Sequence, residues 1–155
     1  MYAGNGEELI KICTAKNISL AEYAILYEME NTGDTREELF KRMTRNLRVM
    51  MQSAAMGMEK EVSSVTGLIG GDAYKLNQYI KKGKSLTGMA MVKAMARALS
   101  CSEVNASMGK IVAAPTAGSC GILPAVIITA GEQLGLTEEE NRMILFDNAY
   151  NLIYA

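Results

Sequence analysis

Hydrophobic positions recur every three or four residues along most of the chain, and this spacing predicts a succession of amphipathic helices. The longest such stretch runs from Thr35 to about Lys60, where apolar positions alternate with basic ones. Two shorter stretches before it, residues 7–16 and 20–31, predict two further helices. The N-terminal part of the chain is therefore expected to be helical.

Several helix starts carry a serine or threonine followed three residues later by glutamate. In this arrangement the two residues satisfy free backbone N–H groups at the beginning of a helix. The pairs are Ser19 with Glu22, Thr35 with Glu38, and Thr137 with Glu140.

The helical pattern continues over residues 73–82, 87–100 and 122–133. Only residues 111–114 favour an extended conformation, because the ring of Pro115 follows them. The predicted fold is all-α or nearly so: a multi-helix domain with two glycine-bearing loops and at most one short extended segment.

Within residues 87–100, Met91, Met95 and Leu99 follow one another at four-residue intervals. We expect this stripe to be buried, because side chains four residues apart lie on the same face of a helix. The chain contains 12 methionines, whose flexible side chains most simply fill irregular gaps between packed helices.

The strongest candidate for chemistry is the segment 114–121, where a short extended stretch enters a glycine-containing turn and then a helix. Free N–H groups at that helix start, with the hydroxyl groups of Thr116 and Ser119, would suit the carboxylate of an amino acid. The alternative is that the same residues form a tight helix-entry turn and nothing else.

A second glycine-bearing loop, residues 66–72, precedes the next helix. It lacks the spacing and the preceding strand of a P-loop. Gly70 and Gly71 permit backbone conformations closed to other residues, and Asp72 is expected to cap the helix that follows. In a functional interpretation, Asp72 or Lys75 would face a ligand.

Between these loops, Asn105, Ser107 and Lys110 bring an amide, a hydroxyl and an ammonium group within one or two helical turns. The local sequence leaves open whether they face solvent or a pocket. Lys110 could serve as a general base only if burial lowered its pKa well below about 10.4.

The chain contains no histidine, which excludes hydrolases of the Ser-His-Asp and Cys-His types and zinc sites of the HExxH type. Cys13, Cys101 and Cys120 form no CxxC pair, have no spacing that suggests convergence and are expected to be reduced thiols. A helix start near Cys120 would favour its thiolate, but without a histidine base we favour a buried thiol. We expect no metal site within this chain, with Cys120 as the one candidate ligand.

The 16 basic residues nearly balance the 17 acidic ones, and this balance gives no reason to expect a nucleic acid or an anionic membrane as partner. No stretch has the unbroken apolar length that crosses a bilayer, and the N-terminus lacks the pattern of a secretory signal. The prediction is a cytoplasmic protein with a small-molecule ligand.

Three sequence blocks occur in the order TGLIGGDAYKL, KKGKSLTG and EVNASMGKIVAAPTAGSCGILPAV. Together they resemble successive blocks of the alpha part of iron-sulfur-dependent L-serine dehydratases, in family order and at family-like spacing. The resemblance is densest between Thr66 and Val126. We therefore expect residues 1–145 to be the N-terminal portion of the catalytic (alpha) domain, and residues 146–155 to be a divergent tail of a truncated domain.

The resemblance implies a largely helical catalytic domain with a 4Fe-4S cluster, whose open iron acts as a Lewis acid on the serine hydroxyl while a base removes the alpha proton. Loss of water and hydrolysis of aminoacrylate would give pyruvate and ammonia. The family's cluster-binding cysteines lie downstream of this chain, and Cys120 occupies a position that is alanine in close relatives. We therefore expect this chain alone to assemble no cluster and to have no dehydratase activity.

The implied partners are L-serine, a beta subunit or domain and the remainder of the alpha domain, in an oligomer. The resemblance assigns no catalytic base. The residues that match the family blocks, and that we expect on the substrate-binding surface, are Gly70, Gly71, Asp72, Asn105, Ser107, Pro115, Thr116, Ala117, Gly118 and Ser119.

Two other interpretations stay open. In the first, the chain is a helical interaction module whose apolar faces are completed by a partner chain, which its 49% of hydrophobic residues would fit. In the second, the chain binds a small anion at the helix start near Gly118 without catalysis.

Overall fold

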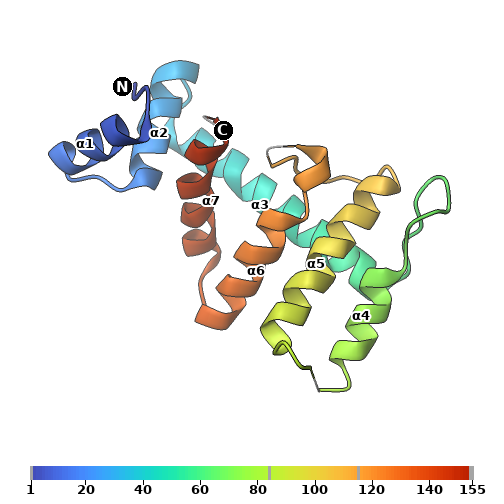
Figure 1. The fold of residues 1–155 in the computed structure, drawn as a ribbon. Helices are drawn as coiled ribbons and strands as arrows, with labels where there is room; N and C mark the ends of the chain where they lie inside the picture. The colour runs from blue at the N-terminus through green and yellow to red at the C-terminus, as the bar shows by residue number, and fades with distance from the viewer. Residues whose placement is uncertain (1, 84, 115, 154–155) are drawn as a thin grey trace. The chain divides into compact units, whose positions relative to one another are not determined.

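The part of the chain described by the computed structural model comprises residues 2–83, 85–114 and 116–153. Two compact units divide the chain: unit 1 combines Met1–Arg45 with Glu138–Ala155, and unit 2 is Asn46–Thr137. The described residues form seven α-helices and one short 3₁₀-helix, and their only bridge pairing is isolated (Figure 1). The predicted all-α fold is confirmed.

Unit 1 contains α1 (Gly6–Lys16), α2 (Leu20–Thr32), the start of α3 (Arg36–Glu59) and α7 (Glu138–Ile153). These bounds agree with the helices expected over residues 7–16, 20–31 and 35–60.

Local side chains define where two of these helices begin. The Ser19 hydroxyl accepts the N–H of Glu22 at 3.1 Å. Thr35 and Glu38 bond reciprocally, because the Glu38 carboxylate accepts the N–H of Thr35 at 2.8 Å while the Thr35 hydroxyl accepts the N–H of Glu38 at 3.3 Å. Both predicted helix starts are therefore confirmed by the contacts that predicted them.

The core of unit 1 includes a contact between α2 and α7. Phe146 is buried in one cluster with Ala21, Ile25 and Leu39, and its ring meets that of Phe40 edge-on with 5.4 Å between centroids. The first residue of the expected divergent tail thus lies in the core of unit 1.

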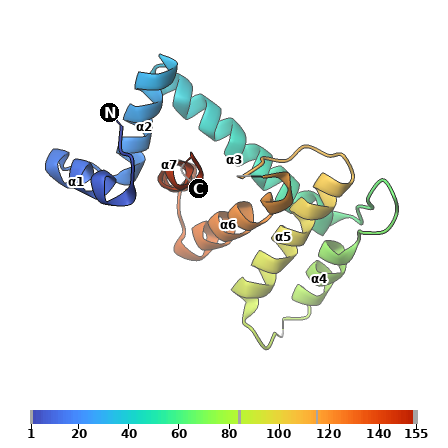
Figure 2. The same cartoon turned by 45° about the horizontal axis from the view of Figure 1, so that its top comes forward.

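Unit 2 contains the rest of α3, then α4 (Asp72–Ile80), α5 (Met89–Ala106), the 3₁₀-helix η1 (Ala117–Ser119) and α6 (Ile122–Leu134). α5 packs against both α4 and α6 and lies between them (Figures 1 and 2). The predicted extended stretch 111–114 forms no strand, and the isolated bridge joins Ser63 to Gly70 instead.

Small residues allow α3 and α5 to approach closely. The Ser100 hydroxyl donates to the carbonyl oxygen of Ser53 at 2.6 Å and accepts the N–H of Gly57 at 2.8 Å. A side-chain carbon at position 57 would lie 2.8 Å from the Ser100 hydroxyl oxygen. The contact between these helices therefore depends on glycine at this position.

The buried face of α5 differs from the prediction. Met91, Met95 and Leu99 are 56%, 49% and 38% exposed, whereas Ala96 and Cys101 are completely buried. The expectation that the methionine stripe is buried was wrong, because the close approach of α3 selects the side of α5 that carries small side chains. The helix also continues past the expected end at residue 100.

Among the described residues, one segment, Ala117–Leu134, is long and apolar enough by length and composition to cross a membrane. This finding corrects the expectation that no stretch reaches that length. Buried residues of the core helix α6, which include Pro124, Ala125 and Ile127, account for part of this apolar composition.

Candidate functional site

The loop before α4 closes tightly on itself. In this glycine loop (residues 62–72), the N–H of Gly71 donates to the carbonyl of Val62 at 3.1 Å. Gly70 has a φ of 146°, and a side-chain carbon there would lie 2.1 Å from the Val62 oxygen. The loop is attached to the end of α5 by a hydrogen bond from the N–H of Val65 to the carbonyl of Ala106, at 3.1 Å. Glycine at position 70 is therefore required by both backbone angle and space.

Asp72 does not cap α4 as expected. The cap residue is Gly71, which has a φ of 80° and no side chain to offer, and Asp72 is the first residue of the helix. The Asp72 carboxylate pairs with Lys75 at 3.3 Å instead, and both side chains are mostly exposed. The reason is that the loop reaches the helix in a left-handed conformation that only Gly71 adopts without strain.

Glu103 caps α4 from the neighbouring helix. Its Oε1 accepts the N–H of Asp72 at 2.7 Å and that of Ala73 at 3.1 Å, and the residue is only 1% exposed. Glu103 was not among the residues that the sequence pattern singled out. It lies in register with the buried face of α5, three residues from Ser100 and seven from Ala96, but this position was ambiguous because an acidic residue near a helix end is usually solvated.

The second loop forms a short turn that is closed by its own hydroxyl groups. In this hydroxyl turn (residues 116–121), the Thr116 and Ser119 side chains cap each other's backbone N–H groups, each at 3.3 Å. The Ser119 hydroxyl also donates to the carbonyl of Ala114 at 3.0 Å. These bonds match the helix-entry interpretation. Pro115, a predicted site residue, lies outside the described residues.

Asn105 connects α5 to the hydroxyl turn. Its side-chain N–H donates to the carbonyl of Ala117 at 3.2 Å. Ser107 instead bonds within its own turn, to the carbonyl of Val104 at 2.8 Å. Gly118 and Lys110 are exposed, so Lys110 lacks the burial that a general base would need.

Both loops are thus attached to the C-terminal end of α5 (Figures 1 and 2). Glu103 bonds the start of α4 behind the glycine loop, and Asn105 bonds the hydroxyl turn. Each residue turns a helix by about 100°, so residues two apart point to nearly opposite sides. The two loops therefore flank the helix end. The structure places Gly70, Gly71 and Asp72 on one flank and the residues around Ala117 on the other.

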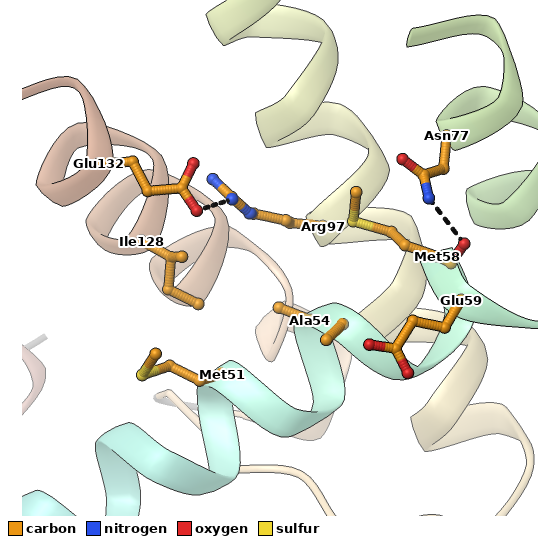
Figure 3. A pocket seen from close by; sticks show the side chains of 9 residues that line it. Met51, Ala54, Met58, Glu59, Asn77, Arg97, Ile128 and Glu132 are labelled. Atoms are coloured by element: carbon orange, nitrogen blue, oxygen red, sulfur yellow. Dashed lines mark hydrogen bonds and ion pairs between the residues drawn. The ribbon is translucent and has the colours of Figure 1, made fainter. Parts of the chain in front are cut away.

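A cavity of about 320 Å³ lies elsewhere in unit 2, and the predicted site residues do not line it (Figure 3). Methionine and alanine side chains of α3 form one wall. On the other side Arg97 of α5 points toward Glu132 of α6. The lining residues are Met51, Ala54, Ala55, Met58, Glu59, Asn77, Arg97, Ile128 and Glu132.

The polar side of this cavity holds α5 and α6 together. Arg97 is 8% exposed, forms an ion pair with Glu132 and donates to the Thr129 hydroxyl at 2.7 Å. The hydrogen bond from Arg97, together with the positive charges of Arg97 and Lys93, lowers the pKa of Glu132.

This lowered pKa predicts a pH dependence of stability. A carboxyl group with a lower pKa in the folded chain contributes stability above its unfolded pKa of about 4.3, and that contribution is lost as the pH falls through the folded value. We therefore expect Glu132→Gln to reduce the free energy of unfolding at pH 7. Below about pH 4, the unfolding free energies of the variant and the wild type are expected to approach each other. Urea unfolding at several pH values between 3 and 7 measures both free energies. Glu59→Gln, which changes another carboxyl group of the same cavity, is the matched control, and identical profiles for the two variants would contradict the expectation.

Two of the three cysteines converge, although their spacing gave no sign of it. Cys101 and Cys120 are buried in one cluster with Ala54, and the Cys120 Sγ lies 3.8 Å from the Cys101 carbonyl oxygen. Burial raises the pKa of both thiols, which disfavours the thiolates that a nucleophile or a metal ligand requires. Within the described residues, no group of three or more histidine, cysteine or acidic side chains could hold a metal ion.

Comparison with known proteins gives a consistent family. A family profile described as "Serine dehydratase alpha chain" matches residues 15–155, which include the stretch 146–155 expected to diverge. A "Probable L-serine dehydratase, alpha chain" of Bacillus subtilis (strain 168) is 44% identical over 142 residues, 92% of this chain and 47% of that protein. An "L-serine dehydratase, alpha chain" of Peptoniphilus asaccharolyticus is 41% identical over 126 residues, 81% of this chain and 43% of that protein.

The chain spans about half the length of the curated relatives it matches. A more distant relative, the "L-serine dehydratase" of Streptomyces coelicolor, is 28% identical over 79% of this chain and 27% of that protein. No solved structure gives a significant match. The resemblance carried by the three sequence blocks is confirmed, and the chain belongs to the serine dehydratase alpha chain family.

Proposed function

We propose that this chain is part of the catalytic component of an L-serine dehydratase, which converts L-serine to pyruvate and ammonia in the cytoplasm, and that the end of α5 contributes serine-binding surface. One observation carries the proposal. The two loops that contain the family blocks are separated by more than 40 positions in sequence, roughly the distance from Gly70 to Thr116, and yet both are bonded to the last turns of one helix.

The start of α6, next to the hydroxyl turn, suits the carboxylate of an amino acid. Thr116 and Ser119 are bonded to each other, so the turn is rigid before any ligand arrives. The next helix, α6, has no side-chain cap hydrogen bond at Gly121, which leaves the positive end of its dipole for an anion. Asn105 holds this turn against α5 through its bond to Ala117. We therefore expect a substitution at Asn105 to displace the turn.

An iron-sulfur cluster does not fit the cysteines of this chain. A cluster held by thiolates needs several of them in one place. Cys101 and Cys120 form only a pair, and burial keeps both as thiols. We propose that the ligands of a 4Fe-4S cluster belong to the part of the alpha chain outside this sequence, and that a beta chain or domain accompanies it.

Serine turnover in a completed enzyme tests the proposal. The chain would be joined to the part of the Bacillus subtilis alpha chain that lies beyond the aligned region, combined with its beta chain and reconstituted anaerobically with iron and sulfide. We expect no pyruvate from the chain alone and serine-dependent pyruvate from the assembly. Asn105→Ala is expected to lower kcat/KM at least tenfold, because a misplaced binding group costs about that much or more.

Asn77→Ala is the matched control for this experiment. Its side-chain N–H also donates to a backbone carbonyl, that of Met58 at 2.9 Å, but on α4 away from the hydroxyl turn. Each variant loses one hydrogen bond, so each is expected to lose about 1 kcal/mol of stability. Pyruvate formation by the chain alone, or equal kcat/KM values for the two variants, would contradict the proposal.

The exposed stripe on α5 favours a second candidate, a helical module without a part in chemistry. Met91 and Met95 face outward on α5, as do Ile122 and Val126 on α6. Exposed apolar residues in such number are typical of a surface that another chain covers. In this case the remaining half of the alpha chain would be the partner, and Asn105→Ala would leave turnover in the assembly unchanged.

A further inference from the structure

Glu103 is a buried acidic side chain whose bonding is one-sided. Its Oε1 accepts two backbone N–H groups at the start of α4, while its Oε2 is buried and has no hydrogen-bond partner. Leaving a buried polar atom without a partner destabilises the folded chain, because the atom loses its bonds to water and gains none. A residue kept in spite of this cost requires an explanation beyond filling space.

The cap that Glu103 provides differs from the side-chain caps of α1 and α2, which are local. Asn5 caps α1 and Ser19 caps α2, each through a residue three positions along. α4 instead receives its cap from α5, across 30 residues of sequence. A local side-chain cap is closed to α4, because its cap residue Gly71 adopts a left-handed conformation and has no side chain. The distant cap additionally ties the start of α4, and the glycine loop before it, to α5.

α3 provides the space in which Glu103 sits. A side-chain carbon on Gly57 would lie 3.1 Å from Glu103 Oε2 and 3.0 Å from the Ser100 Cα. The N–H of Gly57 is bonded to the Ser100 hydroxyl, so the wall opposite Oε2 is fixed. The Glu103 carboxyl group is therefore held from behind by α3 and directed toward α4.

We infer that Glu103 is a positioning residue that sets the glycine loop at a fixed place relative to the hydroxyl turn. Asn105, two residues further along α5, holds the hydroxyl turn, so one helix end determines where both loops lie. This inference rests on the proposed function, in which the two loops share one ligand. Glu103 is covered and does not touch that ligand. A supporting residue of this kind acts through the geometry of the groups that do.

Nuclear magnetic resonance on the whole chain tests the inference, with serine as the probe. Glu103→Ala removes both oxygens, and Glu103→Gln keeps an acceptor for the two N–H groups. We expect Glu103→Ala to speed amide exchange at Asp72 and Ala73 at least tenfold, to shift the Asn105 side-chain and Ala117 signals, and to weaken serine binding at least tenfold. Glu103→Gln is expected to restore serine binding to within about threefold of wild type, because Oε1 can still accept both bonds.

Glu61→Ala is the matched control. Its carboxyl carbon lies 3.6 Å from the position of a side-chain carbon on Gly71, so it borders the same loop, but the residue is exposed. A merely local cap would change exchange at Asp72 without moving the signals of Asn105 and Ala117. That result, or equal serine affinities for Glu103→Ala and Glu61→Ala, would overturn the inference. If Glu103→Ala does not fold, Glu103→Met, which keeps the length of the side chain and removes both oxygens, is measured in the same way, and unchanged Asn105 and Ala117 signals in that variant overturn the inference.

Failure of the proposed function gives a different result. If the signals of the wild-type chain do not respond to serine, this chain does not bind serine and the proposed function fails. The positioning role is then judged by the Asn105 and Ala117 signals alone, which require no ligand. Movement of these signals in Glu103→Ala, and not in Glu61→Ala, supports the coupling of the two loops.

Discussion

Replacing Gly70 with alanine is expected to lower the free energy of unfolding by about 3 kcal/mol or more. The new side-chain carbon would lie 2.1 Å from the Val62 carbonyl oxygen and 2.7 Å from the Ser63 Cα, distances that no carbon atom tolerates. The φ of 146° adds strain of about 1–3 kcal/mol for any residue other than glycine. The loop must therefore open, and the bond from the Gly71 N–H to Val62 is lost with it.

Urea unfolding followed by circular dichroism measures this effect. Gly67→Ala is the matched control: position 67 also has a positive φ, of 72°, but a side-chain carbon there would meet nothing within 4 Å. Its cost is expected to be about 1–2 kcal/mol, from the left-handed conformation alone. Equal losses for the two variants would show that the close approach to Val62 does not exist in solution.

Replacing Gly121 with alanine is expected to lower the free energy of unfolding by about 2–3 kcal/mol. The backbone angles at Gly121, with φ −89° and ψ −23°, suit any residue, so this effect is purely steric. The added carbon would lie 2.5 Å from the carbonyl oxygen of Ala98 and 3.1 Å from its Cα. Because both atoms belong to the backbone of α5, α6 has to move away from α5 to relieve the overlap.

Gly118→Ala, in the same turn, is the control for Gly121→Ala. A side-chain carbon at position 118 would have its nearest contact, the Thr116 hydroxyl oxygen, at an ordinary 3.8 Å. We expect this variant to stay within about 0.5 kcal/mol of wild type. Thermal or urea unfolding of the two variants side by side gives the comparison. A stable Gly121→Ala variant would mean that α5 and α6 do not approach at Ala98.

Signals that lie within a few residues were sufficient to predict most of the helices. The pairs Ser19 with Glu22 and Thr35 with Glu38 predicted helix starts, because the bonding partners are three positions apart in sequence. The helical spacing of apolar residues likewise predicted α3 nearly to its last residue. These features need no knowledge of the rest of the fold.

Features that depend on which helix lies alongside could not be predicted. The methionine stripe of α5 and the small residues on its other side are both compatible with burial, and only the approach of α3 decides between Met95 and Ala96. Glu103 and Cys101 owe their surroundings to segments far along the chain. For the candidate site, local sequence marked the two loops but not the side chain that caps α4.

The attachment of both loops to α5 has a consequence for chain length. In a helix each residue advances the backbone by about 1.5 Å and turns it by about 100°. One residue inserted between Glu103 and Asn105 would rotate one anchor away from its loop while the other stayed in place. An insertion in the connection between α4 and α5 would leave Glu103 and Asn105 in the same orientation relative to each other. Tolerance to insertions should therefore differ sharply between that connection and the end of α5.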